Sequence, residues 1–559
     1  MRSNLDETTE TIPAADREFE NITMEFLAFQ YAAHPVMATR KGVHEYDEGL
    51  DSFQRFAIRD DRDQVRAYLH AIDKISLADL SFDMRVDYRV ARSSAQMTLA
   101  ALEHQRWPET RPDRYLDTIF SGLSLLIDRD SDPASVRAPG LLGRLRTVPE
   151  ALAEAQNNLQ KPPRLFLEAA LEQTESGALL FSESLPAFVA SLRDVPLKNA
   201  LREAAVPAQT ALTDFARFLR ENLLPHASEE FALGRERFDY FLRVGHLMPE
   251  TADELLAIGR EEIALAQKEL TETAHRVEPG GAWEAQLIHL RKSHPKAGEL
   301  TEAYAQEIIK ARDFIEYHRL MTPPESEELR VETTPAWARA AFPGVTYRPA
   351  APFEEQQTGH LWVAPPTKGL PPKLREAELQ EHSQCQIPLV ALHEGYPGRH
   401  LQTGRANQTA SRFRRHFAES GLFTEGWAAY CEGMMWEHGY FNDPRIRLMQ
   451  WRNRLEQACV AVIDVEIHTQ GKSLHDATQF LQDTAKTGLI PARAAALRCA
   501  MAPTQGMTAV MGRRSLSSLR DEMMRRQGAR FTARRFHDRL LAEGSIQPSL
   551  LREIFFAVR

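Results

Sequence analysis

Apolar side chains recur at helical spacing along most of this chain, and that pattern constrains the fold more than any other feature. A capping-box sequence at Thr251 and Glu254 marks the start of one helix. Apolar residues then follow at mostly helical intervals: Leu255, Ile258, Ile263 and Leu265. A second stripe before Pro225 consists of Leu212, Phe215, Leu219 and Leu223. Such stripes usually face a core, so the sequence predicts a mainly α fold.

One segment departs from the helical pattern. Residues 343–366 are rich in proline, aromatic and β-branched side chains, which favour extended backbone. We expect a small β-sheet there, beside the helix with the polar motif described next, where it could pair with a substrate backbone. The 559 residues allow two or more cores. We expect a disordered N-terminus (1–16), a helical region (17–240) and a metal-binding catalytic region (241–559).

A polar motif interrupts the apolar pattern at residues 392–402. His393 and Glu394 match the opening of a zinc-peptidase signature, in which the imidazole binds metal and the carboxylate accepts a proton from metal-bound water. The second histidine of that signature usually follows one helical turn later, but here the next one is His400. On one helix the two imidazoles would share a face about 10 Å apart along the axis, and a kink at Pro397 would shorten that separation. Arg399 cannot be a ligand at ordinary pH.

Further polar groups follow the motif. Glu425 has the position of the third metal ligand in one large class of zinc peptidases. Asp464 and His468 lie one helical turn apart in an apolar stretch, which is typical of a pair that orients a ligand or stabilises a transition state. Each group alone is equally consistent with a satisfied polar residue in a core or at a helix end. Together, in this order, they favour a metal site.

The charge balance and the cysteines exclude several classes of protein. The formal net charge of −10 argues against nucleic acid as a partner. Four scattered cysteines form no disulfide framework, and none is spaced as in a zinc finger. The first residues are polar and acidic, unlike a signal peptide, and no apolar run is long enough to span a membrane. We therefore expect a cytoplasmic protein with no membrane or nucleic-acid partner.

Three runs of the chain resemble the bacterial family called domain of unknown function 885, which is grouped with the zincin-like metallopeptidases. They are His-Glu-Gly-Tyr-Pro-Gly-Arg-His-Leu-Gln (393–402), Glu-Gly-Trp-Ala-Ala-Tyr (425–430) and Ile-Asp-Val-Glu-Ile-His (463–468). Residues 42–47 resemble an N-terminal family element, and residues 359–363 resemble an extended segment before the motif helix. The resemblance implies a large, zincin-like helical fold.

The resemblance also implies roles for single residues. The ligands of zinc, or of another divalent ion, would be His393, His400 and Glu425. The catalytic residues would be Glu394, His468, Asp464 and Arg498. The substrate-binding residues would be Tyr347, His360 and Trp362. Glu394 would be the general base, His468 held by Asp464 would steady the oxyanion, and Arg498 would bind the oxyanion or a substrate carboxylate.

The chain departs from the family at several polar positions. The family usually has His-His where this chain has Arg399 and His400, an arginine at Val460, and tyrosines at Cys499 and Ala509. Arginine and tyrosine near a metal commonly stabilise an oxyanion. We expect a metal-dependent hydrolase acting on short peptides or other small amides. Two alternatives stay open: a metal-dependent lyase on a small amino-acid-like substrate, and a non-catalytic metal- or peptide-binding protein.

Overall fold

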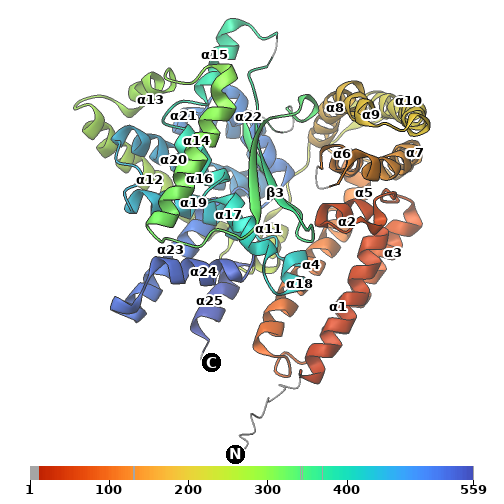
Figure 1. The fold of residues 1–559 in the computed structure, drawn as a ribbon, viewed down its shortest axis with the longest axis horizontal. Helices are drawn as coiled ribbons and strands as arrows, with labels where there is room; N and C mark the ends of the chain where they lie inside the picture. Colours follow the sequence, from red (N-terminus) through yellow and green to blue (C-terminus); the bar gives the residue numbers. More distant parts are fainter. Residues whose placement is uncertain (1–11, 130–131, 340–341, 343, 368, 558–559) are drawn as a thin grey trace, which may run out of the picture.

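The protein is mainly helical, with one small sheet among the helices (Figure 1). The computed structural model describes residues 12–129, 132–339, 342, 344–367 and 369–557. The expected mainly α fold with a small sheet is confirmed. In the part of the chain so described, no helix is both long and apolar enough to cross a membrane.

The N-terminal helices lie to one side of the sheet, at the right of Figure 1. They are α1 (Ala14–Ala33), α2 (Pro35–Lys41), α3 (Arg55–Ile72), α4 (Phe82–Glu103), α5 (Trp107–Thr110), α6 (Pro112–Asp128), α7 (Ala134–Asn158), α8 (Arg164–Leu179), α9 (Leu185–Ser191) and α10 (Val195–Phe218). The stripe on α10 is buried at Leu212 and Phe215, as its spacing predicts. Residues 14–16 of the segment expected to be disordered begin α1, and residues 1–11 lie outside the described part.

The remaining helices pack into the larger part of the molecule. They are α11 (Arg235–Val244), α12 (Ala252–Val277), α13 (Trp283–Arg291), α14 (Leu300–Tyr317), α15 (Pro372–Gln380), α16 (Ile387–Glu394), α17 (Arg399–Asn407), α18 (Arg412–Phe417), α19 (Gly421–Glu437), α20 (Pro444–Gln470), α21 (Leu474–Ala485), α22 (Leu489–Met501), α23 (Thr508–Gln527), α24 (Ala533–Ala542) and α25 (Pro548–Phe556). Thr251 and Glu254 form the expected capping box at the start of α12. The domain boundary near residue 240 stays a prediction.

The sheet has three strands, β1 (Glu327–Thr333), β2 (Val345–Arg348) and β3 (Gln357–Val363), in the order β1-β3-β2. β3 is parallel to β1 and antiparallel to β2. Because side chains alternate along a strand, the two faces of the sheet meet different cores. Leu361 and Val363 join the core around α14, α16 and α19, whereas Trp362 joins the core of α6–α10. The sheet therefore separates the two halves of the molecule, and β2 contacts α16 as expected.

Candidate functional site

The motif segment is broken into two helices. α16 ends at Glu394, and α17 begins at Arg399 after the turn through Gly395 to Gly398. The two helices approach so closely that a Cβ on Gly398 would lie 2.1 Å from the carbonyl oxygen of His393. His393 and His400 therefore do not lie on one continuous helix, and the direction of each side chain depends on this turn.

The side chain of Arg399, the first residue of α17, points back toward the motif. Its guanidinium hydrogen-bonds both carboxylate oxygens of Glu425, and its Nε lies 3.7 Å from Oε2 of Glu394. Burial alone would raise the pKa of Glu425, but the charges of Arg399 and His393 outweigh it and lower that pKa to about 2. Burial likewise opposes the charge of Arg399, yet Glu394 and Glu425 raise its pKa. A permanent cation thus lies between two of the carboxylates expected at the metal centre.

His393 lies at the same place and is held by acidic groups. Its Nδ1 is 2.9 Å from Oε1 of Glu432, and its Nε2 is 3.9 Å from Oε2 of Glu425. Burial lowers the pKa of His393, but hydrogen bonds to Glu425 and Glu432 outweigh that effect and raise the pKa to about 10. Glu432 is two helical turns after Glu425 on α19, so its spacing was the available sequence signal for this second partner.

The structure does not bring His400 to this group. Its side chain is 2% exposed and points to the sheet, where Nδ1 is 3.1 Å from the hydroxyl of Tyr347 and Nε2 contacts Glu327. Consecutive residues of a helix point about 100° apart, so once Arg399 faces Glu425, His400 must face elsewhere. Of the expected ligands His393, His400 and Glu425, the first and the last meet here, His400 does not, and Arg399 occupies the third side; the ligand set stays a prediction.

These side chains do not fit a zinc ion. A zinc site needs three or four nitrogen, sulfur or oxygen ligands around one point, and an arginine cannot supply one. Among the described residues, no group of three or more His, Cys, Asp or Glu side chains could hold a metal ion. The guanidinium of Arg399 already balances the charge of Glu425, which an ion would otherwise have to balance.

Asp464 and His468 lie in the core and not at the site. His468 Nδ1 accepts a hydrogen bond from the Leu233 amide at 3.2 Å, and its Nε2–H donates to the Cys499 carbonyl at 2.9 Å. Asp464 accepts from the amides of Thr504 and Gly506, and burial raises its pKa to about 8 despite these donors. α20 is surrounded by protein at this point, and both ring nitrogens of His468 are bonded to backbone groups, which favours a structural role; the catalytic role expected for this pair stays a prediction.

A cavity of about 780 Å³ opens beside His393 and Glu394. Arg498 on α22 lines it, and in the described part of the chain its guanidinium makes no hydrogen bond or ion pair, so it keeps the expected capacity to bind an anion. Two other charged residues on the wall pair with each other, Arg452 Nη1 and Glu456 Oε2, at 2.8 Å. Three positions at which the resemblance implies larger polar side chains also line this cavity: Val460, Cys499 and Ala509.

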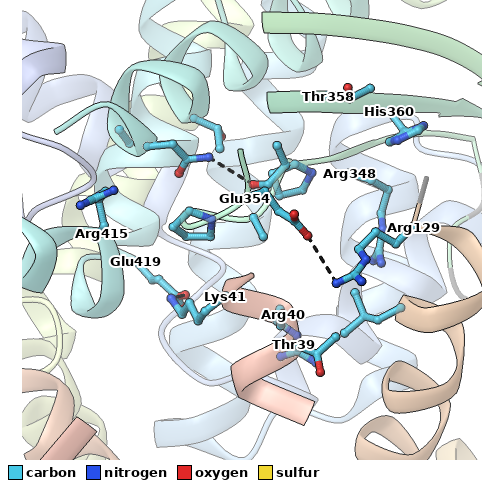
Figure 2. A pocket seen from close by; sticks show the side chains of 18 of the residues that line it. Thr39, Arg40, Lys41, Arg129, Arg348, Glu354, Thr358, His360, Arg415 and Glu419 are labelled. Atoms are coloured by element: carbon cyan, nitrogen blue, oxygen red, sulfur yellow. Dashed lines mark hydrogen bonds and ion pairs between the residues drawn. The ribbon is translucent and has the colours of Figure 1, made fainter. Parts of the chain in front are cut away.

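The three expected substrate-binding residues divide between the two faces of the sheet. Tyr347 faces the motif: its amide donates to Glu394 Oε2 at 3.3 Å, and its hydroxyl meets His400. His360 and Trp362 face the other way and line a second cavity, of about 590 Å³ (Figure 2). They lie across the sheet from His393, and their expected role in substrate binding stays a prediction. Side chains alternate between the two faces of β3, but the sequence does not tell which face meets the motif. This division could therefore not be predicted from the alternation alone.

The chain belongs to the DUF885 family, described as bacterial protein of unknown function, whose model matches residues 35–554. No curated protein is significantly similar to it. Two solved structures share its fold. One, from Shewanella oneidensis, is described as a "putative lipoprotein of unknown function"; it is 21% identical, with a TM-score of 0.79, and the match covers 96% of this chain and 99% of that one. The other, a "putative lipoprotein" from Colwellia psychrerythraea, is 16% identical, with a TM-score of 0.82 and coverage of 97% and 98%.

Proposed function

We propose that this chain binds a short peptide or another small carboxylate-bearing amide in the cavity beside His393, and that it does so without a catalytic metal ion. The observation that carries this proposal is the position of Arg399, whose guanidinium lies between Glu394 and Glu425. It gives the site the positive charge that a metal would bring, but it offers no lone pair and no bound water to activate.

The cavity walls support a peptide-like ligand. The uncompensated guanidinium of Arg498 can take a carboxylate in two parallel hydrogen bonds. β2 is an edge strand, and its first residue, Val345, lines the cavity together with the preceding Gly344, so an extended backbone could pair there. The volume of about 780 Å³ is in the range of small-molecule sites. Replacement of the large family side chains at Val460, Cys499 and Ala509 leaves room for the ligand.

The metal-dependent hydrolase inferred from the sequence is the second candidate, and one observation favours it. His393, Glu394 and Glu425 all line the cavity together, so the general base and two of the ligand-type side chains are retained. For this function Arg399 would have to leave Glu425. The lyase alternative requires the same departure, because it too needs a metal to polarise its substrate.

Metal content and peptide affinity distinguish these candidates. Protein purified without chelators should contain no stoichiometric zinc by mass spectrometry, and a dipeptide library screened by calorimetry should yield ligands. Arg498→Ala should weaken the best dipeptide about tenfold, the loss expected for a charged hydrogen bond, whereas Arg493→Ala, an exposed arginine on the same helix α22, should not. About one zinc per chain that His393→Ala removes would overturn the proposal in favour of the hydrolase.

The location of the protein is a separate proposal. The lipoprotein descriptions of the two solved relatives support the cell envelope over the cytoplasm that the sequence favoured. Fractionation of the native cells with an antibody against the chain tests this: recovery with the envelope supports it, and recovery with the cytosol contradicts it.

A further inference from the structure

The second cavity lies across the sheet from the first and shares no lining residue with it. One wall is the outer face of β2 and β3, with Arg348, His360 and Trp362. The opposite wall comes from α2 and α6, and the third from α17, α18 and the loop of residues 349–356 (Figure 2). It is thus enclosed by both halves of the molecule.

Basic side chains dominate this cavity, and half of them are paired. Lys41 binds Glu419, and Arg129 lies 3.5 Å from Glu354 and 2.9 Å from Asp132. The third paired cation is Arg414, which hydrogen-bonds Asp87 and Glu543 on the side away from the cavity. These ion pairs hold the cavity walls in place, and they neutralise most of the positive charge of the three paired side chains.

Three further arginines line the cavity without an ion pair to any described residue: Arg40, Arg348 and Arg415. The guanidinium of Arg348 packs on the rings of Trp362 and Phe342 at 5.1 and 5.4 Å from their centroids, and that of Arg415 on Phe353 at 4.9 Å. Such stacking fixes a guanidinium while leaving its N–H edge free to donate. Figure 2 shows Arg415 on one side of the cavity, Arg348 on the other and Arg40 below them.

Three buried polar atoms of residues that line this cavity also lack a hydrogen-bond partner among the described residues. They are Nε of Arg129, Nε of Arg415 and Oδ2 of Asp128. Buried donors and acceptors are nearly always satisfied in folded proteins, by protein, by water or by a ligand. Burial raises the pKa of Asp128 to about 7, and the charges of Arg348 and Arg137 only partly offset this. Asp128 is therefore only partly ionised near neutral pH and cancels only part of the positive charge.

Residues 41–44 brace the loop of residues 349–356, which forms part of the cavity wall. The carbonyl of Lys41 accepts from the Phe353 amide at 3.0 Å, and His44 Nε2 lies 3.0 Å from Glu354. Gly42 has φ +85°, and a Cβ there would lie 2.8 Å from the Glu354 amide nitrogen, so only glycine allows this approach. The N-terminal helices are thereby locked to the loop of residues 349–356, and the cavity is formed before any ligand enters.

From this geometry we propose that the second cavity is a binding site for a small organic polyanion, a molecule with two or more carboxylate or phosphate groups. Guanidinium groups on opposite walls would each take one anionic group in paired N–H···O bonds, which Arg provides better than Lys. The volume of about 590 Å³ accommodates a molecule the size of a tricarboxylic acid or a sugar phosphate. The site is independent of the function proposed for the first cavity.

The test uses citrate, pyrophosphate, sulfate and acetate as probes on the full chain, at matched ionic strength. We expect citrate or pyrophosphate to bind in calorimetry and to raise the melting temperature, and acetate to do neither. A preference for citrate identifies a carboxylate ligand, and a preference for pyrophosphate a phosphate ligand. Equal small effects of all four salts would overturn the proposal, because only general screening would then be present.

Variants locate the binding. Arg40 is exposed at the end of α2, and its guanidinium makes no hydrogen bond or ion pair with any described residue. Arg40→Gln should therefore fold normally and lower the affinity for the preferred probe at least tenfold. Arg348→Gln should do the same. The matched control Arg493→Gln, also exposed, and Arg498→Gln in the first cavity should leave the affinity within twofold. Unchanged affinity in Arg40→Gln and Arg348→Gln, or a loss in Arg498→Gln, would place the anion elsewhere and sink the proposal.

Discussion

The two cavities lie on opposite faces of one three-stranded sheet, yet the balance of acidic and basic side chains that line them is opposite. Beside His393, glutamates outnumber arginines, and Arg399 is bound to Glu425. Across the sheet, basic residues outnumber acidic ones, and Arg348 and Arg415 rest on aromatic rings. An arginine held by a carboxylate closes a site to cations, whereas an arginine held by a ring keeps its donors for an anion. The partner of an arginine therefore decides which ligands its cavity can bind.

The largest expected effect comes from removing the cation of the first cavity. Arg399→His would place a third ligand-type side chain opposite His393 and Glu425 and release Glu425 from its ion pair. Zinc content should rise from none to about one ion per chain, measured by mass spectrometry after dialysis. The control Arg498→His adds a histidine to the same cavity without those partners and should bind none. If Arg399→His stays free of zinc, Arg399 is not what separates this site from a metal site.

The next effect concerns the wall of the first cavity, which depends on Asp464. Its carboxyl holds the amides of Thr504 and Gly506. Asp464→Ala should lower the free energy of unfolding by about 2–4 kcal/mol, because two buried amides lose their acceptor and a cavity is left. Denaturant unfolding measures this, and Asp464→Asn, which keeps one acceptor, should lose less. An equal loss in both variants would mean that the acceptor is not what matters.

The raised pKa of Asp464 adds a pH dependence to the same measurement. The folded protein keeps this proton up to about pH 8, while the unfolded chain releases it near its usual value of 3.8. The contribution of protonated Asp464 to the free energy of unfolding is therefore full below about pH 4 and is lost as the pH rises to 8. Relative to Asp464→Asn, the wild-type protein should become progressively less stable between pH 5 and pH 8. A constant difference between the two would show that Asp464 is ionised throughout.

A smaller effect should appear in the second cavity, through Asp128. Sulfate keeps its charge between pH 6 and 8, so a change in its affinity reports on the protein. Protonation of Asp128 on falling pH removes a negative charge beside Arg348, Arg137, His360 and Trp337, and should strengthen sulfate binding roughly 3- to 10-fold. Asp128→Asn should bind sulfate tightly with little pH dependence. If His360→Gln flattens the profile instead, the titrating group is the imidazole.

The smallest effect is expected from His468, which the sequence placed among the catalytic residues. Both of its ring nitrogens bond to backbone groups, the amide of Leu233 and the carbonyl of Cys499, and His468 itself lines neither cavity. His468→Gln should therefore change dipeptide and citrate affinities by less than about twofold while reducing thermal stability, since buried backbone groups lose good partners. A loss of affinity without a loss of stability would contradict this and indicate that His468 acts in ligand binding.

Much of this arrangement can be predicted from the sequence, because periodic signals are local. The capping box at Thr251 starts α12, the stripe through Leu212 and Phe215 is buried, and the extended segment forms β2 and β3 next to α16. The grouping of His393 with Glu425 also follows from the sequence, since each lies on a helix that runs past the other. The family that these runs resemble is confirmed by a family model that matches residues 35–554.

The remainder depends on directions that no local pattern specifies. The turn at Gly398 decides that Arg399 and not His400 faces Glu425, and it is set by contact between two helices. The partner of His400, Glu327, comes from a distant strand whose register the sequence does not reveal. His468 looks like a site residue on α20 until the neighbours on all sides of that helix are known.

Helix α17 gives its first residue, Arg399, to one cavity and its later residues, from Gln402 to Asn407, to the other. A helix of this length moves as a rigid rod, so a shift or rotation that suits an occupant on one side alters the wall on the other. Linkage then requires any such influence to be mutual: the factor by which the polyanion changes peptide affinity equals the factor by which the peptide changes polyanion affinity. The nine residues of α17 are thus one element through which occupation of one cavity could alter the other.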